Sequence, residues 1–191
     1  MIWWLCGSRH AGILMPWPVP VEGPGLSLCG RPPVSLEGVM PYTYEYPRPM
    51  VVADVVAVRP GSEGPDARTR EILLVRRANE PFKGSWAIPG GFVEMDEDVP
   101  DAASRELREE TGLEISPEDL VEVGVFGRPG RDPRGRTISV VYANVVSPDH
   151  SEATAGDDAA DAKWFDSRAL PELAFDHADV IPAALARLRA V

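Results

Sequence analysis

The sequence predicts a single domain of the α/β (α+β) class, and three observations lead to this fold class. The chain has 191 residues, enough for one domain with a substantial core, and 44% of them are hydrophobic. Short apolar runs rich in β-branched residues alternate with turn residues, which is typical of strands. Two longer segments, one in the middle of the chain and one at its end, show helical spacing instead.

Residues 1–45 differ from the rest of the chain, because they are rich in Pro and Gly and show neither helical nor strand periodicity. Met1–Leu5 is apolar, but it is too short for a signal peptide and has no basic residues before it. We interpret residues 1–45 as a disordered extension or a mis-assigned start, with a small family-specific extension as the third alternative. The folded domain is expected at residues 46–191.

The first half of this domain is expected to begin with a hairpin. Met50–Val58 is apolar and β-branched, and Glu71–Arg76 repeats this character after a loop, Arg59–Arg70, that is dense in Gly, Pro and charge. Pro81–Gly91 is expected to form a loop and a short strand. A helix is expected over Asp98–Thr111.

In the second half, the strands Leu120–Phe126 and Thr137–Val146 are expected on either side of a basic loop, GRPGRDPRGR. The remaining expected elements are an acidic loop (Ser151–Ala160), a short strand (Ala162–Phe165), one helical turn (Leu170–Leu173) and a terminal helix (His177–Ala190). Asp176 is placed as the N-cap of the terminal helix, and Pro182 is expected to kink or divide that helix.

Charge and cysteine content exclude several classes of function. The net charge of −11 and the pI of about 4.7 argue against binding to a nucleic-acid polymer or an anionic membrane. Both cysteines, Cys6 and Cys29, lie in residues 1–45; they are too few for a disulfide framework or a zinc site. No run is long enough to span a bilayer, so we expect a cytoplasmic protein.

The segment Gly91–Leu113 holds eight acidic residues, three of them in an unusual arrangement. Glu106, Glu109 and Glu110 are spaced i, i+3 and i+4, so their side chains fall within about 100° of arc on one helix face. That face is apolar at its start. Two of the three glutamates lie in the last helical turn, where the helix dipole disfavours anions. A bound divalent cation would offset these penalties, and clustered carboxylates suit Mg²⁺ or Mn²⁺.

The alternative is a solvated acidic face, which is what most charge runs are. It explains the acidic residues near the start of the helix, Asp96, Glu97, Asp98 and Asp101, because the helix dipole favours anions there. It does not explain glutamates on the apolar side of the last turn. We therefore favour a metal site.

These residues also resemble the Nudix box, G-x5-E-x7-R-E-U-x-E-E-x-G-U, in which U is aliphatic. All nine fixed positions are filled in one register, by Gly91, Glu97, Arg105, Glu106, Leu107, Glu109, Glu110, Gly112 and Leu113. The resemblance implies a mixed β-sheet sandwiched between helices, with the box forming a strand, a loop and a helix. It also implies hydrolysis of a nucleoside diphosphate linked to another group, with Mg²⁺ or Mn²⁺.

The resemblance further implies roles for single residues. Glu106, Glu109 and Glu110 would bind metal together with a backbone carbonyl near Gly90. Catalytic roles would fall to Glu109, Glu106, Glu97 and Arg105, with Glu97 paired to Arg105 and one glutamate orienting the attacking water. From its position, Gly112 is expected to end the helix with positive φ. Leu107 and Leu113 are expected to pack against the sheet.

Segments outside the box are similar to the bacterial ADP-ribose pyrophosphatase branch of the family: PFKGSWAIPGGFVE, RDPRGR and AFDHADVI. That branch implies ADP-ribose as substrate, with AMP and ribose 5-phosphate as products. In the basic loop we expect Arg131 and Arg136 to contact phosphate or ribose, and ordinary surface arginines are an equal alternative. Phe82 could stack on adenine, whereas Trp86 is interpreted as a core residue.

Several alternatives stay open. The substrate could instead be a (deoxy)nucleoside triphosphate, a dinucleotide cofactor or a nucleotide sugar. A non-catalytic ADP-ribose sensor is the alternative of another class; such sensors carry a DNA-binding winged helix after the domain, for which we expect no room here. Loop carboxylates that could assist catalysis are Glu152, Asp157 and Asp158. His177 is interpreted as a cap or packing residue. The resemblance also makes a homodimer plausible.

Overall fold

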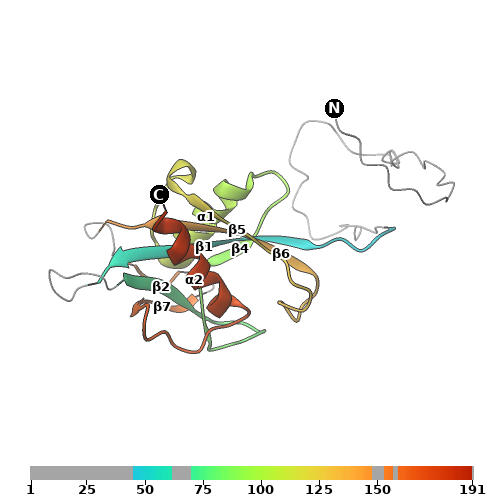
Figure 1. The fold of residues 1–191 in the computed structure, drawn as a ribbon. Helices are drawn as coiled ribbons and strands as arrows, with labels where there is room; N and C mark the ends of the chain where they lie inside the picture. The colour runs from blue at the N-terminus through green and yellow to red at the C-terminus, as the bar shows by residue number, and fades with distance from the viewer. Residues whose placement is uncertain (1–44, 62–69, 148–152, 157–158, 191) are drawn as a thin grey trace, which may run out of the picture. The chain divides into compact units, whose positions relative to one another are not determined.

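The computed structural model describes residues 45–61, 70–147, 153–156 and 159–190. Their elements, shown in Figure 1, are β1 (Met50–Pro60), β2 (Arg70–Arg77), β3 (Trp86–Ala87), β4 (Gly90–Phe92), α1 (Val99–Thr111), the 3-10 turn η1 (Pro117–Asp119), β5 (Val121–Phe126), β6 (Thr137–Val145), β7 (Ala159–Asp166) and α2 (His177–Leu188). The expected strands and both expected long helices are therefore present.

The strands form one mixed sheet in the order β3-β2-β1-β6-β5, with β4 also paired to β1 and β7 to β2. β1 runs parallel to β6, with Val55 opposite Tyr142, and antiparallel to β2 and β4. The first two strands make the expected hairpin, and β5 and β6 pair antiparallel on either side of the basic loop. The mixed sheet that the resemblance implied is confirmed.

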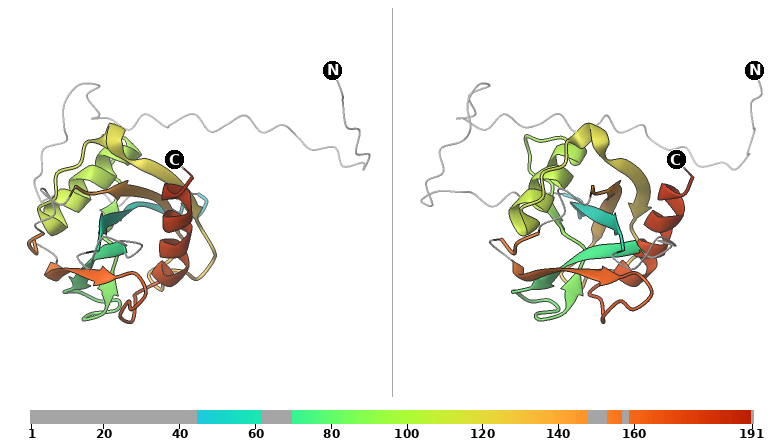
Figure 2. Two further views of the ribbon diagram at one scale, coloured as in Figure 1. Left: turned by 60° about the vertical axis from the view of Figure 1, so that its left-hand side comes forward. Right: turned by 90° about the vertical axis from the view of Figure 1, so that its left-hand side faces the viewer.

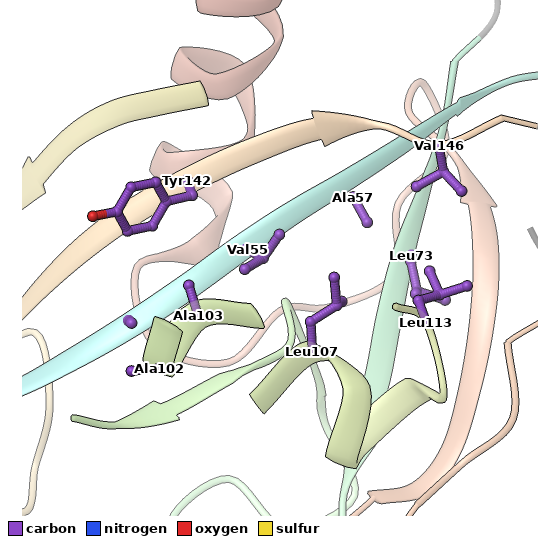
Figure 3. Close-up of a cluster of buried hydrophobic side chains, with 10 residues drawn as sticks. Val55, Ala57, Leu73, Ala102, Ala103, Leu107, Leu113, Tyr142 and Val146 are labelled. Atoms are coloured by element: carbon purple, nitrogen blue, oxygen red, sulfur yellow. The ribbon is translucent and has the colours of Figure 1, made fainter. Parts of the chain in front are cut away.

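Both faces of β1 are buried. Its residues from Val52 to Val58 are all buried, and successive residues of a strand point to opposite faces. Val55 and Ala57 pack with Leu107 of α1 in one apolar cluster (Figure 3). Val56 and Val58 instead belong to a second cluster that contains Val180, Ile181 and Ala184 of α2. The two helices accordingly lie on opposite faces of the sheet (Figure 2). Leu107 and Leu113 are both in the first cluster, as expected.

The C-terminal end of α1 is closed by residues from two parts of the chain. Gly112 has φ of 71° and donates its N–H to the Arg108 carbonyl at 2.8 Å, as its expected role requires. Thr154 N–H donates to the carbonyl of Thr111 at 2.9 Å, and Gly156 N–H to that of Glu110 at 3.0 Å. The carbonyl groups left without partners at a helix end are thus satisfied by the segment between β6 and β7.

Two expectations about the C-terminal part were wrong in detail, and so was one of the two alternatives expected for Pro182. Leu170–Leu173 is not helical; Leu173 forms a parallel bridge to Trp86 instead, because the chain there runs alongside β3. Pro182 does not divide α2, since burial of Ile181 and Ala184 against the sheet holds the helix on both sides of it. β7 is longer than expected because it pairs with β2 from Glu71 to Arg77.

Some expectations fall on residues outside the described ranges. These include the interpretation of residues 1–45, except for its last residue, and both cysteines. Among the described residues, no helix combines the length and apolar character needed to cross a membrane.

Candidate active site

A cavity of about 370 Å³ opens where β1, β4 and α1 meet the basic loop and the start of α2. Acidic residues contribute to its lining together with arginines and aromatic rings. The residues used below are Asp54, Arg77, Gly90, Gly91, Phe92, Arg105, Glu106, Glu110, Arg131, Arg134, Phe175 and His177. The box therefore meets the RDPRGR and FDH segments at one place, although they are far apart in the sequence.

The carboxylates in the cavity oppose one another's ionisation. Burial is the main cause that raises the pKa of Glu110 to about 8, and the negative charges of Glu106 and Asp54 add to it. Burial also raises the pKa of Glu106, and it raises that of Asp54 to about 6. Glu110 accepts the Gly90 N–H at 3.1 Å, and Asp54 accepts the hydroxyl of Ser139. These carboxyl groups are therefore harder to ionise in the metal-free protein than they would be in water.

Arg105 joins the other box carboxylates. Its Nη2 and Nε donate to the two oxygens of Glu97 at 2.7 and 3.0 Å, which confirms the expected pair. Its Nη1 donates to Glu106 at 2.7 Å and to Glu109 at 3.1 Å. A further bond from Nη2 to the Phe92 carbonyl at 3.1 Å ties α1 to β4. The hydrogen bonds from Arg105 are the main cause that lowers the pKa of Glu97.

The donor set fits a divalent cation in chemistry. Hard carboxylate oxygens are the ligands that Mg²⁺ and Mn²⁺ prefer, and a cation would offset the desolvation, and the smaller repulsion, that raise the pKa values of Glu106 and Glu110. In this conformation no three acidic, His or Cys side chains within the described ranges are arranged as a metal site. Arg105 holds Glu106 and Glu109, and the Glu109 side chain is 45% exposed, so these two must reorient to join Glu110.

Two adjacent glycines fit the site for different reasons. A Cβ at Gly91 would overlap the Glu106 carboxylate, which is the end of a flexible side chain. A Cβ at Gly90 would lie 2.7 Å from the Asp54 Cα, and Gly90 has φ of 155°. Gly91 therefore makes room for a functional side chain, whereas Gly90 makes room for the backbone of β1.

We expect opposite results from alanine at these two positions. Gly91→Ala should displace the Glu106 carboxylate and lower kcat roughly 10- to 100-fold, with a nearly unchanged melting temperature. Gly90→Ala should destabilise the fold by about 2–4 kcal/mol, because backbone atoms cannot move aside. Thermal melting and steady-state kinetics on both variants check this. A strongly destabilised Gly91→Ala protein would contradict the assigned contact.

The four arginines of the basic loop have different surroundings. Arg131 is buried and donates to Asp176 through Nε at 3.0 and 3.1 Å and through Nη2 at 2.7 Å. Arg134 lines the cavity, held by the buried Asp132. Arg136 donates to the Thr137 carbonyl at 3.2 Å and is not part of the lining. Arg128 is exposed and reaches Asp179 at 3.5 Å.

The aromatic residues near the site also differ, because some of them line the cavity and others do not. Phe82 lies outside the lining, with its ring 4.9 Å from that of Phe175 in an edge arrangement. Phe92 and Phe175 line the cavity instead, with the Arg134 guanidinium carbon 5.1 and 5.6 Å from their ring centres. Trp86 packs against Phe165 at 4.7 Å, which agrees with its interpretation as a core residue.

Sequence reasoning missed Asp54 and gave His177 no place in the site. Asp54 carried a signal, because it is the single charged residue in the apolar run MVVADVVAV. His177 had no comparable signal, because its contact with the N–H of Ile88 joins residues 89 apart in the sequence. The loop carboxylates Glu152, Asp157 and Asp158 lie outside the described residues.

The metal-free protein is expected to lose stability as the pH rises from 6.5 to 8.5. Glu110 has a pKa of about 8 when folded and 4.5 as its ordinary value, so the stability that its proton contributes decreases from about pH 4.5 to about pH 8 and levels off above, and the first part of this window lies on the steep part. His177 and Asp54, with folded pKa values of about 3 and about 6, change mainly below it. The slope should approach ~1 kcal/mol per pH unit. Denaturant titrations in chelator should show the slope in the wild type and a flatter response in Glu110→Gln; equal slopes would contradict the assignment.

Comparison with known proteins adds independent findings. The model of the NUDIX domain family matches residues 49–184. The chain is 48% identical over 114 residues to an ADP-ribose pyrophosphatase of Methanocaldococcus jannaschii, which covers 60% of this chain and 65% of that protein. It is 33% identical over 147 residues to the ADPR responsive transcriptional repressor NtrR of Acinetobacter baylyi, covering 75% of this chain and 56% of the repressor. The chain thus spans less than two thirds of either relative.

Solved structures are similar as well. A MutT/nudix family protein from Enterococcus faecalis superposes with a TM-score of 0.68 at 33% identity, covering 78% of this chain and 65% of that one. The NUDIX domain of Shewanella oneidensis NrtR, crystallised with ADP ribose, gives a TM-score of 0.64 at 29% identity over 75% of this chain and 90% of that domain.

Proposed function

Because the chain belongs to the NUDIX domain family, we propose that it is a metal-dependent hydrolase of a nucleoside diphosphate linked to another group. The proposed substrate is ADP-ribose, and the products are AMP and ribose 5-phosphate. The observation that carries this proposal is the cavity that Glu106 and Glu110, both half-buried, line together with Arg105, Arg134 and two aromatic rings. The similarity to an ADP-ribose pyrophosphatase supports the choice of substrate.

In this proposal the carboxylates of Glu106, Glu109 and Glu110, with a backbone carbonyl near Gly90, hold Mg²⁺ or Mn²⁺. The bound cation would neutralise charge on the diphosphate and lower the pKa of the attacking water. Glu109 or Glu106 orients that water. Arg105, fixed by Glu97, keeps α1 against the turn after β4, so that the carboxylates stay aligned with the substrate.

Substrate contacts follow from the placement of the arginines. Arg134 is directed by Asp132 and faces the cavity, so it is the arginine that we assign to the substrate. Arg131 is buried in its ion pair with Asp176, so we assign it a supporting role. Arg136 and Phe82 lie outside the lining and would contact only a part of the substrate that extends beyond the cavity.

The proposal is tested by measuring AMP formation from ADP-ribose with Mg²⁺, with and without chelator. A nucleoside triphosphate, a dinucleotide cofactor and a nucleotide sugar serve as competing substrates, and Mn²⁺ replaces Mg²⁺ in a parallel series. AMP production that is lost with chelator supports the proposal. Turnover of triphosphates alone would preserve the chemistry and reject ADP-ribose as the substrate.

A second candidate function is binding of ADP-ribose without turnover, as in a sensor. The similarity to NtrR and to the NrtR domain solved with ADP ribose favours this alternative. The filled box, including Glu109 and Glu110, favours catalysis. Tight binding of ADP-ribose by calorimetry, without AMP formation under any metal, would establish the sensor.

The proposal also covers the setting of the enzyme. We place it in the cytoplasm as a homodimer whose folded domain is residues 46–191, with residues 1–45 as an extension that the activity does not need. Light scattering after size exclusion tests the dimer. Comparison of the full chain with a variant starting at residue 46 tests the extension; lower kcat in the shorter chain would reject this division.

A further inference from the structure

His177 is the first residue of α2, and it reaches the cavity from the face of the sheet opposite α1. Only 4% of the residue is exposed, and it lines the same cavity as Glu110 and Arg134. Its Nδ1 accepts the N–H of Ile88 at 3.1 Å, two residues before Gly90. The imidazole is therefore held in one orientation by the strand that leads into the box.

This hydrogen bond fixes the tautomer of the ring. An imidazole nitrogen that accepts a hydrogen bond carries no proton, so the neutral ring carries its proton on Nε2. Burial is the main cause that lowers the pKa of His177 to about 3, and the charges of Arg131 and Arg77 lower it further. At neutral pH the ring is uncharged and is a donor through Nε2–H.

The surroundings of Nε2 indicate that this donor opens on the cavity. Within the described part of the chain, Nε2 has no hydrogen-bond partner. It is also not fully enclosed, because the one enclosed polar side-chain atom without a partner among these residues is the Oγ of Ser104. Since Nε2 is neither paired nor enclosed, it must open on the space that His177 lines. A buried polar group in a binding cavity generally meets a partner there.

We propose that His177 binds the substrate as an uncharged donor, through a hydrogen bond from Nε2–H to an oxygen of the nucleoside diphosphate. This inference rests on the proposed function for the class of ligand. Phosphate oxygens only accept hydrogen bonds, and Arg134 and the metal already supply positive charge. A neutral donor adds affinity that does not change between pH 6 and 8, whereas an ordinary histidine would gain and lose charge in this range.

The test compares His177→Asn with His177→Gln, using ADP as a diphosphate probe in calorimetry with Mg²⁺ at pH 6 and pH 8. Asparagine can still accept from Ile88 N–H, but it cannot reach the position of Nε2. Glutamine reaches that position and loses the bond to Ile88. We expect Kd for ADP to rise roughly 10- to 100-fold in His177→Asn, equally at both pH values, with a small change in melting temperature. His177→Gln should recover affinity despite a lower melting temperature.

Other results would overturn the inference. A Kd within about twofold of the wild type in His177→Asn would mean that His177 is only structural. An effect that appears at pH 6 and vanishes at pH 8 would mean that the charged ring binds. Absence of ADP binding to the wild type would reject the diphosphate contact. If ADP-ribose is not hydrolysed but the loss of ADP affinity is seen, the proposed function fails and the role of His177 stands.

Discussion

Replacing Glu110 with glutamine is expected to reduce turnover by about 1,000-fold or more while the protein stays folded. Glutamine keeps the shape of the side chain and can still accept the N–H of Gly90, so the contact between α1 and the start of β4 survives. What is lost is a carboxyl group whose pKa burial has raised to about 8 and which would ionise to bind a cation. Without this charge a divalent cation has one anionic ligand fewer in the part of the site with the least water.

Three measurements separate this effect from unfolding. The melting temperature without metal should equal or exceed that of the wild type, because a destabilising carboxylate has been removed. The rise in melting temperature on adding Mg²⁺ should be much smaller in the variant. Glu118→Gln, an exposed change in η1, should alter neither quantity. Near-normal kcat in Glu110→Gln would refute the metal role of this residue.

Arg131→Ala is expected to destabilise the protein by roughly 3–5 kcal/mol, the largest effect of any change in the basic loop. The side chains of Arg131 and Asp176 are only 3% and 7% exposed, so the substitution leaves a buried carboxylate without its three hydrogen bonds. The loss should extend to the cavity, because Asp176 immediately precedes His177 and the start of α2. Urea unfolding followed by circular dichroism measures the effect.

Arg128→Ala is the matched control on the same loop. The Arg128 and Asp179 side chains are 69% and 68% exposed, and such surface pairs contribute about 0–1 kcal/mol. A double variant, Arg131→Met with Asp176→Leu, should regain much of the stability, because no unpaired charge is then buried. If Arg131→Ala instead unfolds like the wild type and only raises KM, then Arg131 contacts the substrate, as the sequence suggested.

Local patterns in the sequence were reliable where the contacts themselves are local. The spacing of the glutamates, the end of α1 at Gly112 and the pairing of Glu97 with Arg105 all lie within about two helical turns and one short loop. Helix geometry and glycine chemistry fix such contacts regardless of the rest of the fold. The positions of the box could therefore be matched before the sheet was known, whereas the pairing of Glu97 with Arg105 and the roles of the glutamates were implied by the resemblance.

Contacts across the sheet could not be predicted in the same way. Whether an arginine of the basic loop meets a substrate or an aspartate depends on Asp176, 45 residues further along the chain. The conformation of Leu170–Leu173 depends likewise on pairing with Trp86. Local spacing carries no information on such partners, and a basic loop looks the same whether its arginines are buried or exposed.

The closing of α1 by Thr154 and Gly156 makes the last turn of this helix depend on a distant part of the chain. A helix can begin to form as soon as its own residues are available, but the turn that carries Glu109 and Glu110 has unsatisfied carbonyl groups until the segment after β6 is in place. That segment follows the parallel pairing of β1 with β6, a slow kind of contact to form because it joins distant parts of the chain. Partly folded chains would therefore carry a frayed acidic turn, and the affinity of the proposed metal site would depend on the completeness of the fold.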